Sequence, residues 1–155
     1  MSLYLTVKTL HILSATVLFG TGLGIAFFFW MGGRSGDDRA AYFAARATVI
    51  ADVVFTTTAG IVQPLTGAWL IQLAGFDPAD GWLLATYALY VLAGACWLPV
   101  VWLQLRVRDQ LAAKLAGGDF DAALHARYRR WWFALGWPAF IALIVVVHLM
   151  VAKSL

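Results

Sequence analysis

The chain has 155 residues, of which 63% are hydrophobic and only 12% are charged, and its mean hydropathy is +0.81. A soluble domain is roughly half apolar and about a quarter charged, so this composition excludes an ordinary soluble protein and indicates that most of the chain faces lipid. The net charge of +3 does not indicate nucleic-acid binding, because the basic residues gather in two loops between apolar stretches. A single cysteine, Cys96, excludes a disulfide framework and a cysteine-rich zinc site, and the lack of glutamate excludes paired-glutamate chemistry.

Four stretches are apolar and long enough, at about 20 residues or more, to cross a bilayer as helices. They cover residues 3–31, 47–74, 82–105 and 131–152. They lack the alternation of barrel strands, and the first is expected to be a retained helix because it is longer than a signal peptide. In the segment before the last stretch, Asp119 or Asp121 is expected to cap a helix that continues into it. We therefore predict an all-α, integral membrane four-helix bundle that forms a single domain.

The orientation follows from the lysines and arginines, which accumulate in cytoplasmic loops. The loop after the first stretch and the segment before the last carry most of them: Arg34, Arg39, Arg46, Arg106, Arg108, Lys114, Arg127, Arg129 and Arg130. These two segments lie on the same side of a four-helix bundle. The sequence therefore predicts a multi-pass protein of a bacterial inner membrane with both termini on the periplasmic side.

Two intramembrane histidines are the most informative polar residues, because ionisable groups are costly in hydrocarbon and mark functional sites. His11 lies three residues inward of Lys8 in the first stretch, and His148 lies five residues inward of Lys153 in the last. If both lysines mark the outer interface, the two imidazoles lie about 4.5 and 7.5 Å below it, at 1.5 Å per residue. Two imidazoles at matching depth are suited to axial ligation of one haem iron or to a shared metal.

Haem b is favoured over a bare ion because the porphyrin supplies four nitrogens and asks the protein for one or two ligands, whereas zinc needs three or four. Lys8 lies on the helix face of His11, where it can pair with a haem propionate. The other residues expected to contact the cofactor are Ser14, Ala15, Gly22 and Gln63. Copper is the weaker option, and the histidines can instead serve only as polar contacts between helices.

Asp52 has two interpretations. The preferred one is a charge at the inner interface that pairs with a loop arginine, since Asp52 follows Arg46 by six residues. The alternative is a proton-uptake carboxylate, with Thr56 and the threonines after it continuing a polar track. Further along, Pro64 interrupts the backbone hydrogen bonds of the same helix. Tyr87 and Tyr90 of the third stretch are expected in the interfacial aromatic belt, with a position beside a cofactor or a quinone as the alternative.

Six separated motifs carry a resemblance to a known family. They are Val7–Leu13, Gly20–Gly24, Ala51–Asp52 with Phe55–Thr56, Gln63–Gly67, Cys96–Val100 and Trp137–Phe140. Together they resemble a bacterial family of predicted integral membrane proteins, domain of unknown function 2269, over nearly the whole chain. This resemblance implies a membrane location and no particular activity.

The opening pattern, Lys8-x-x-His11, is also distantly similar to the HemJ-type protoporphyrinogen oxidases and to the CopD-like copper-resistance membrane domains. HemJ-type proteins are membrane helical bundles that bind b-type haem through a histidine of the first helix, so the resemblance implies a ligand role for His11. The chain departs from the HemJ pattern after Gly24, where Ile25 and Ala26 stand in place of a Pro-Arg pair. HemJ-type proteins also use a lysine in a later helix, and the third span here has none. Protoporphyrinogen oxidation therefore stays only an alternative. Haem binding is still expected, because His148 can serve as the second axial ligand.

The sequence thus predicts an integral membrane b-type haem protein that acts in electron transfer or a small redox reaction, with His11 and His148 as axial ligands. The expected partners are the lipid bilayer, a quinone or another redox partner, and a second copy of the chain. Three alternatives stay open: a HemJ-like oxidoreductase acting on a porphyrin or another lipophilic substrate, a copper or other metal carrier, and a non-catalytic membrane assembly subunit.

Overall fold

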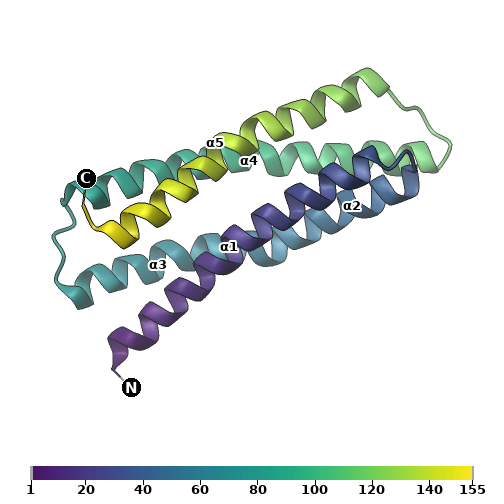
Figure 1. The fold of residues 1–155 in the computed structure, drawn as a ribbon. Coiled ribbons are helices and arrows are strands. Elements are labelled where there is room, and N and C mark those ends of the chain that lie inside the picture. Colours follow the sequence, from purple (N-terminus) through teal and green to yellow (C-terminus); the bar gives the residue numbers. More distant parts are fainter. Residues whose placement is uncertain (1, 155) are drawn as a thin grey trace.

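Four helical stretches run up and down along one axis in the computed structural model, which describes residues 2–154 (Figure 1). The elements are α1 (Leu3–Arg34), α2 (Asp38–Ala51), the π-helical turn η1 (Asp52–Thr56), α3 (Thr57–Ala74), α4 (Gly81–Leu115) and α5 (Ala122–Ala152). No residue of the described range lies in a strand, and all four stretches are long and apolar enough to cross a membrane. The predicted all-α fold with four spanning helices is confirmed.

Each helical stretch extends past the predicted apolar span at the end that carries the basic residues. The second stretch begins at Asp38 instead of residue 47, α4 continues to Leu115 instead of residue 105, and α5 begins at Ala122 instead of residue 131. Hydropathy marks only the part of a helix that lies in hydrocarbon. The added turns of α2 belong to an amphipathic helix and bury Ala44 and Ala45, so protein packing stabilises them.

The helix ends are capped by residues that favour these positions. The carboxylate of Asp121 accepts a hydrogen bond from the backbone N–H of Leu124 at 2.9 Å, which makes Asp121 the N-cap of α5, as predicted. Gly75 follows α3 with a φ of 71°, in the left-handed region where glycine is favoured. Gly75 thus marks the start of the α3–α4 loop, and Asp121 marks the end of the α4–α5 loop.

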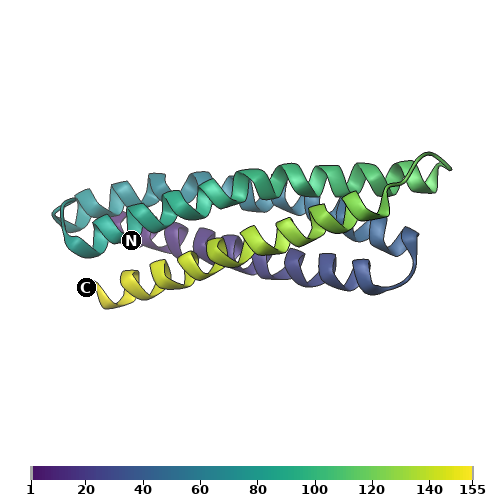
Figure 2. The ribbon, with the colours of Figure 1, turned by 90° about the horizontal axis from the view of Figure 1, so that it is seen from above.

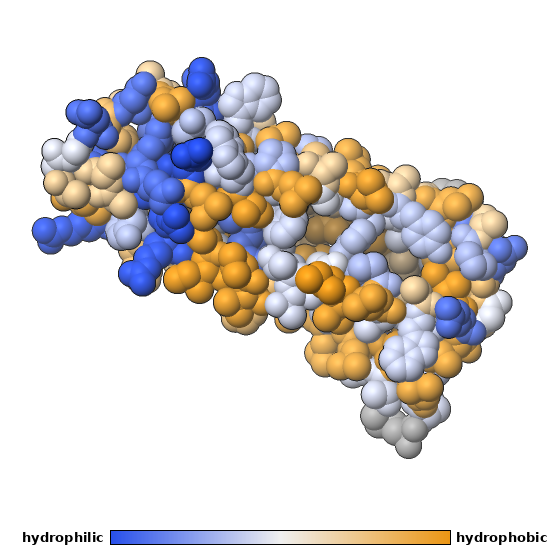
Figure 3. Space-filling model, turned by 180° about the vertical axis from the view of Figure 1, so that it is seen from behind, coloured by the Kyte–Doolittle hydropathy of each residue, from blue (hydrophilic) through white to orange (hydrophobic). Residues whose placement is uncertain are grey.

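The helices are arranged as two groups joined near one end. Helix α1 packs along α2 and α3, α5 packs along α4, and α2 connects the groups by packing against α4. Both views show the α1–α2 and α4–α5 loops at one end, which we call the basic end, and the two termini with the α3–α4 loop at the other, which we call the terminal end (Figures 1 and 2). The hydrophilic surface is concentrated at the basic end, and apolar residues cover much of the flank beside it (Figure 3).

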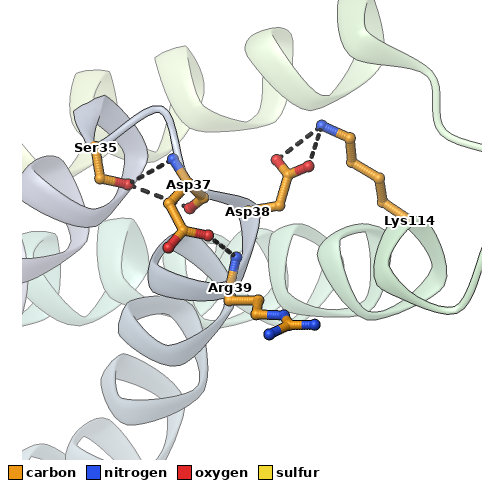
Figure 4. A network of polar contacts seen from close by, with 5 residues as sticks. All are labelled: Ser35, Asp37, Asp38, Arg39 and Lys114. Atoms are coloured by element: carbon orange, nitrogen blue, oxygen red, sulfur yellow. Dashed lines mark hydrogen bonds and ion pairs between the residues drawn. The ribbon is translucent and has the colours of Figure 1, made fainter.

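Polar contacts order the basic end. Asp37 accepts a hydrogen bond from the backbone N–H of Arg39 at 2.8 Å and caps α2 (Figure 4). Asp38 forms an ion pair with Lys114 of α4 at 2.7 Å, and the Ser35 hydroxyl accepts from the backbone N–H of Asp37 at 3.2 Å. These contacts attach the start of α2 to the end of α4, although exposed ion pairs add little stability on their own.

The buried residues form two apolar clusters with polar groups between them. The larger cluster lies toward the basic end and contains Phe29, Ala45, Val100, Leu103, Val107, Leu111 and Trp132. The smaller one lies at the terminal end and contains Trp82, Leu83 and Leu149. The buried polar residues are Thr48, Asp52, Thr66, Thr86 and Gln104. Buried polar groups inside a membrane bundle are the first candidates for function.

Candidate functional site

His11 is half-buried where α1 packs on α3. Its Nδ1 lies 2.7 Å from the Thr66 hydroxyl, and the Gln63 side-chain amide donates a hydrogen bond to the His11 backbone carbonyl at 2.7 Å. Gly67 lies beside the ring, since a Cβ atom there would be 3.4 Å from His11 Cε1. The ring therefore rests directly on the backbone of α3, and a glycine at position 67 leaves room for it.

Ser14 completes this group, which we call the His11 cluster (His11, Ser14, Gln63 and Thr66). The Gln63 amide donates to the Ser14 hydroxyl at 2.6 Å, and that hydroxyl donates to the His11 carbonyl at 3.1 Å. Gln63, which was expected to contact the cofactor, thus lies beside His11. The cluster holds one turn of α1 against α3 by polar contacts, in a region where apolar packing alone would allow the helices to slide.

When the Thr66 hydroxyl donates to a carbonyl of its own helix, its contact with His11 selects one tautomer of the imidazole. A threonine hydroxyl has one proton, and that of Thr66 is donated to the Val62 carbonyl of the preceding helical turn at 2.7 Å. Its oxygen therefore accepts the bond from His11 Nδ1–H. Because a neutral imidazole carries one proton, the lone pair is on Nε2, the nitrogen opposite the Thr66 contact.

His148 lies in a different environment. It is exposed on α5, whose neighbouring residue Leu149 is buried with Trp82 and Leu83 of α4. Within residues 2–154 its side chain makes no hydrogen bond. Helices α1 and α5 contact each other through aromatic side chains away from both histidines, at Phe19 with Phe140 and at Phe29 with Trp132. Hydrogen bonds therefore hold His11 in a defined position, whereas His148 is exposed on the surface. Ligation of one iron by both histidines stays a prediction.

The other expected cofactor contacts are spread along α1. Lys8 is exposed, with its ammonium 5.6 Å from the ring centre of Tyr4, and Ala15 is half-buried. Gly22 has no atom within 4 Å of the position where a Cβ would stand. Gly22 is thus open to its surroundings, and other helices of the described chain do not pack against it.

Asp52 forms a second polar group, at the point where α2 changes into the π-helical turn. Its side chain is only 1% exposed. The Gln104 amide donates to Oδ2 at 2.6 Å, and the Trp97 indole N–H is shared between Oδ1 and Oδ2 at 3.2 Å each. The indole of Trp132 donates in turn to Gln104 Oε1 at 3.4 Å. We call these four residues the Asp52 cluster. It joins α2 to α4 and α5 through neutral donors.

The expected ion pair between Asp52 and Arg46 is wrong. Arg46 is exposed, and the described part of the chain gives Asp52 no ion pair. The reason is helical geometry: side chains three or four residues apart share a face, but a separation of six places them about 120° apart. Asp52 therefore points into the bundle, while Arg46 points away from it.

Two threonines flank Asp52 at intervals of four residues. The hydroxyl oxygens of Thr48 and Thr56 are both buried, and neither has a hydrogen-bond partner among the described residues. Unpartnered buried hydroxyls are uncommon and call for an explanation. The backbone also departs from an α-helix here, because the Asp52 carbonyl accepts from both the backbone N–H and the hydroxyl of Thr57, five residues ahead. Such π-helical turns are frequent at functional sites.

Two cavities are open to the surface. The larger, about 220 Å³, lies at the basic end between Lys114, His125 and Arg129, and Arg129 closes one side by donating to the Gly33 carbonyl at 2.9 Å. The smaller, about 160 Å³, lies between α1 and α3 beside Ser14. Within residues 2–154, His, Cys, Asp and Glu side chains form no group of three that could hold a metal ion.

Sequence reasoning identified Asp52 but missed the residues that hold it. Gln104 and Trp97 lie 52 and 45 residues further along the chain, so their contact with Asp52 depends on how α4 packs. One signal was available, since Gln104 is an amide near the end of an otherwise apolar stretch. The four-residue spacing of Thr48, Asp52 and Thr56 was another, because it places all three on one helix face.

Comparison with protein families agrees with the four spanning helices. The family model for a predicted integral membrane protein, DUF2269, matches residues 5–154. No curated protein and no solved structure matches the chain. The match includes every helix and both polar clusters. The protein is therefore an integral membrane protein, and it belongs to the DUF2269 family.

Proposed function

We propose that the protein binds b-type haem through His11 and acts in electron transfer or a small redox reaction, in a bacterial inner membrane with both termini on the periplasmic side. The observation that carries this proposal is the 2.7 Å contact between His11 Nδ1 and the Thr66 hydroxyl. Histidines that ligate metals commonly donate their second ring N–H to a fixed acceptor, which orients the ring and raises its basicity. The Nε2 lone pair of His11 is then available to an iron.

The donor set suits haem better than a bare ion. His11 offers one nitrogen, and a porphyrin needs one or two axial ligands because it brings four of its own. When bound, the group would supply a one-electron couple. Ser14, Ala15 and Gly22 lie on the helix that carries His11 and offer it small neighbours, while the exposed ammonium of Lys8 is free to pair with a propionate.

The second axial position has two candidate sources. His148 is exposed on α5, so it is accessible to a group bound outside its own helix pair or to a second copy of the chain. A bis-histidine iron has no open site and suits electron transfer, with a quinone or a protein as partner. Ligation by His11 alone leaves a position open and suits an oxidoreductase acting on a porphyrin or another lipophilic substrate. The hydrogen bonds that hold only one of the two histidines favour this second candidate function.

Visible absorption of the purified protein, with haem added during expression, tests the proposal. We expect a b-type spectrum that is lost in His11→Ala. A His148→Ala variant separates the two functions: it converts a six-coordinate spectrum into a five-coordinate one if His148 is a ligand, and it leaves a five-coordinate spectrum unchanged if it is not. His125→Ala, at the basic end, is the matched control and should match the wild type.

Three results would overturn the haem proposal. They are a protein that stays colourless after haem supplementation, a haem spectrum indifferent to both His11→Ala and His148→Ala, and elemental analysis that finds copper without iron. The last result would favour a metal carrier. A colourless protein whose stability is unchanged in both alanine variants would favour an assembly subunit.

A further inference from the structure

A line of polar groups follows one face of α2, η1 and α3. It consists of the side chains of Thr48, Asp52, Thr56, Gln63 and Thr66, with the carbonyl of Gly60 between them. The spacing of three or four residues keeps these groups on one side of the helix. From first to last they extend over about 27 Å, at 1.5 Å per residue, which is close to the thickness of the hydrocarbon core.

The line has contacts with the rest of the bundle along its length. Asp52 is held by Gln104 and Trp97, as described above. The Gly60 carbonyl accepts a hydrogen bond from the Tyr90 hydroxyl at 2.5 Å. At the terminal end, the line finishes in the His11 cluster through Gln63 and Thr66. A membrane bundle with so few polar residues has therefore gathered most of its buried ones on a single face.

Asp52 is the only acidic side chain of this line, and all its hydrogen-bond donors are neutral. Acidic residues inside membrane proteins are costly and commonly act in proton relays. A purely structural role would be to join α2 to α4, which needs only an acceptor for Gln104 and Trp97. That role does not account for the two buried, unpartnered hydroxyls of Thr48 and Thr56 on either side of the carboxyl.

We propose that Asp52 binds and releases a proton on a path along this polar line, between the basic end and the His11 cluster. In the step, the carboxylate accepts one proton to become a neutral acid and later returns it, so no electron or co-reactant is needed. Thr48 and Thr56 have hydroxyls free to accept and donate on either side, as buried polar groups or bound waters do in such paths. The proposal does not depend on haem.

On the elements that pack against Asp52, the charged groups nearest to it lie toward the basic end and are engaged elsewhere or exposed. Arg46 of α2 is exposed, Arg106 of α4 lies over the Trp102 ring at 5.2 Å, and Arg129 of α5 binds the Gly33 carbonyl. Helix α1 has no charged residue between Lys8 and Arg34. The other titratable groups of α4 in this region are Tyr90 and Cys96. Among the described residues, these charged side chains therefore do not form an ion pair that would hold Asp52 in its ionised form.

Infrared spectroscopy of the protein in lipid bilayers tests proton binding directly. On changing the pH, we expect a carboxylic acid C=O band that appears in the wild type and is absent in Asp52→Asn. Asp119→Asn, an exposed loop residue, is the matched control and should keep the band. If no band depends on Asp52 over the range in which the protein stays folded, the proposal fails. Circular dichroism at each pH checks the fold.

Proton flux into vesicles tests the path. The protein is reconstituted with a trapped pH-sensitive dye, and a potassium gradient with valinomycin drives protons inward. We expect faster acidification than in protein-free vesicles and a return toward the protein-free rate in Asp52→Asn and Thr56→Val. Thr58→Val is the matched control, because Thr58 is exposed and its hydroxyl returns to its own helix at Val54, 2.7 Å away.

The outcomes separate the path from a structural role. If Asp52→Asn conducts like the wild type, or if the wild type conducts no faster than empty vesicles, the path is wrong. If Thr56→Val and Thr58→Val lower the rate equally, the polar line is not the route. All of these measurements use the protein without added haem, so they can succeed or fail whatever the outcome of the haem spectrum.

Discussion

The hydroxyl of Tyr90 donates to the backbone carbonyl of Gly60, across the space between α4 and α3, at 2.5 Å. This carbonyl is the one that Pro64 leaves without a helical partner, because proline has no N–H to donate to the residue four positions before it. In a membrane, such a carbonyl must find a partner inside the protein. Tyr90 provides this partner, which is why the tyrosine is directed into the bundle. The sequence had favoured a position in the interfacial belt instead.

Replacing Tyr90 by phenylalanine should therefore destabilise the protein by about 1–2 kcal/mol, since it removes only the hydroxyl and leaves the Gly60 carbonyl unsatisfied. Thermal or denaturant unfolding in detergent micelles measures this. Tyr87→Phe, on the exposed side of α4, is the matched control. In Pro64→Ala the restored N–H binds Gly60, so the Tyr90→Phe cost should largely disappear there. A cost that is equal in both backgrounds would contradict this account.

Replacing Gln104 by leucine should cost about 1–3 kcal/mol, because the 2.6 Å hydrogen bond to Asp52 is lost in a fully buried site. The side chains have similar volume, so the loss reports the polar contact more than the packing. Unfolding in detergent measures the cost. Gln72→Leu, an exposed residue of α3, should have little effect. Equal costs for the two variants would show that the Asp52 cluster does not stabilise the bundle.

Replacing Thr66 by valine removes the acceptor for His11 Nδ1–H and keeps the shape of the side chain. If His11 binds haem, we expect its affinity for haem to fall about 10- to 100-fold, as it does when the partner of a metal-ligating histidine is removed. Titration of the apoprotein with haem measures the affinity. Thr86→Val is the control, because Thr86 is buried and binds only the Trp82 carbonyl of its own helix. A similar affinity in both variants would argue against an oriented His11 ligand.

Replacing Gly33 by alanine should leave the protein about 1–2 kcal/mol less stable than Gly136→Ala does, because both positions are helical and gain from alanine but only Gly33 loses a contact. A Cβ atom at this position would overlap the guanidinium of Arg129, which would have to move and lose its 2.9 Å bond to the Gly33 carbonyl. Gly136→Ala provides the contrast, because that helical position is open and alanine is the better helix former by about 1 kcal/mol. Unfolding that shows the same change for both glycines would contradict the proposed contact.

The sequence predicted the four spanning helices, and it narrowed the cap of the last helix to Asp119 or Asp121, because these features depend on local properties. A run of apolar residues determines a spanning helix, and a short polar side chain before a helix determines its cap. The first turns of α2 were missed because their stability comes from packing Ala44 and Ala45 against other helices, which a hydropathy window does not detect. The helix bounds were therefore predicted well only where lipid determines them.

The candidate site was predicted in part. Within the His11 cluster, Ser14 and Gln63 were predicted as contacts of a cofactor bound at His11, and the structure places both beside His11 itself. The Asp52 cluster was misread, because the nearest arginine in the sequence was taken as its partner and the face on which each side chain lies was not considered. Contacts between Asp52 and residues some fifty positions away depend on tertiary packing, which no local pattern contains.

The π-helical turn at residues 52–56 also sets the rotational phase of everything that follows it in the same stretch. Such a turn holds one residue more than an α-helix needs, and each residue of an α-helix turns the chain by about 100°. If all five residues took regular α-helical geometry instead, Gln63 and Thr66 would turn by about a quarter-turn away from α1. The additional residue of this turn thus lets Asp52 face α4 while Gln63 and Thr66 face His11.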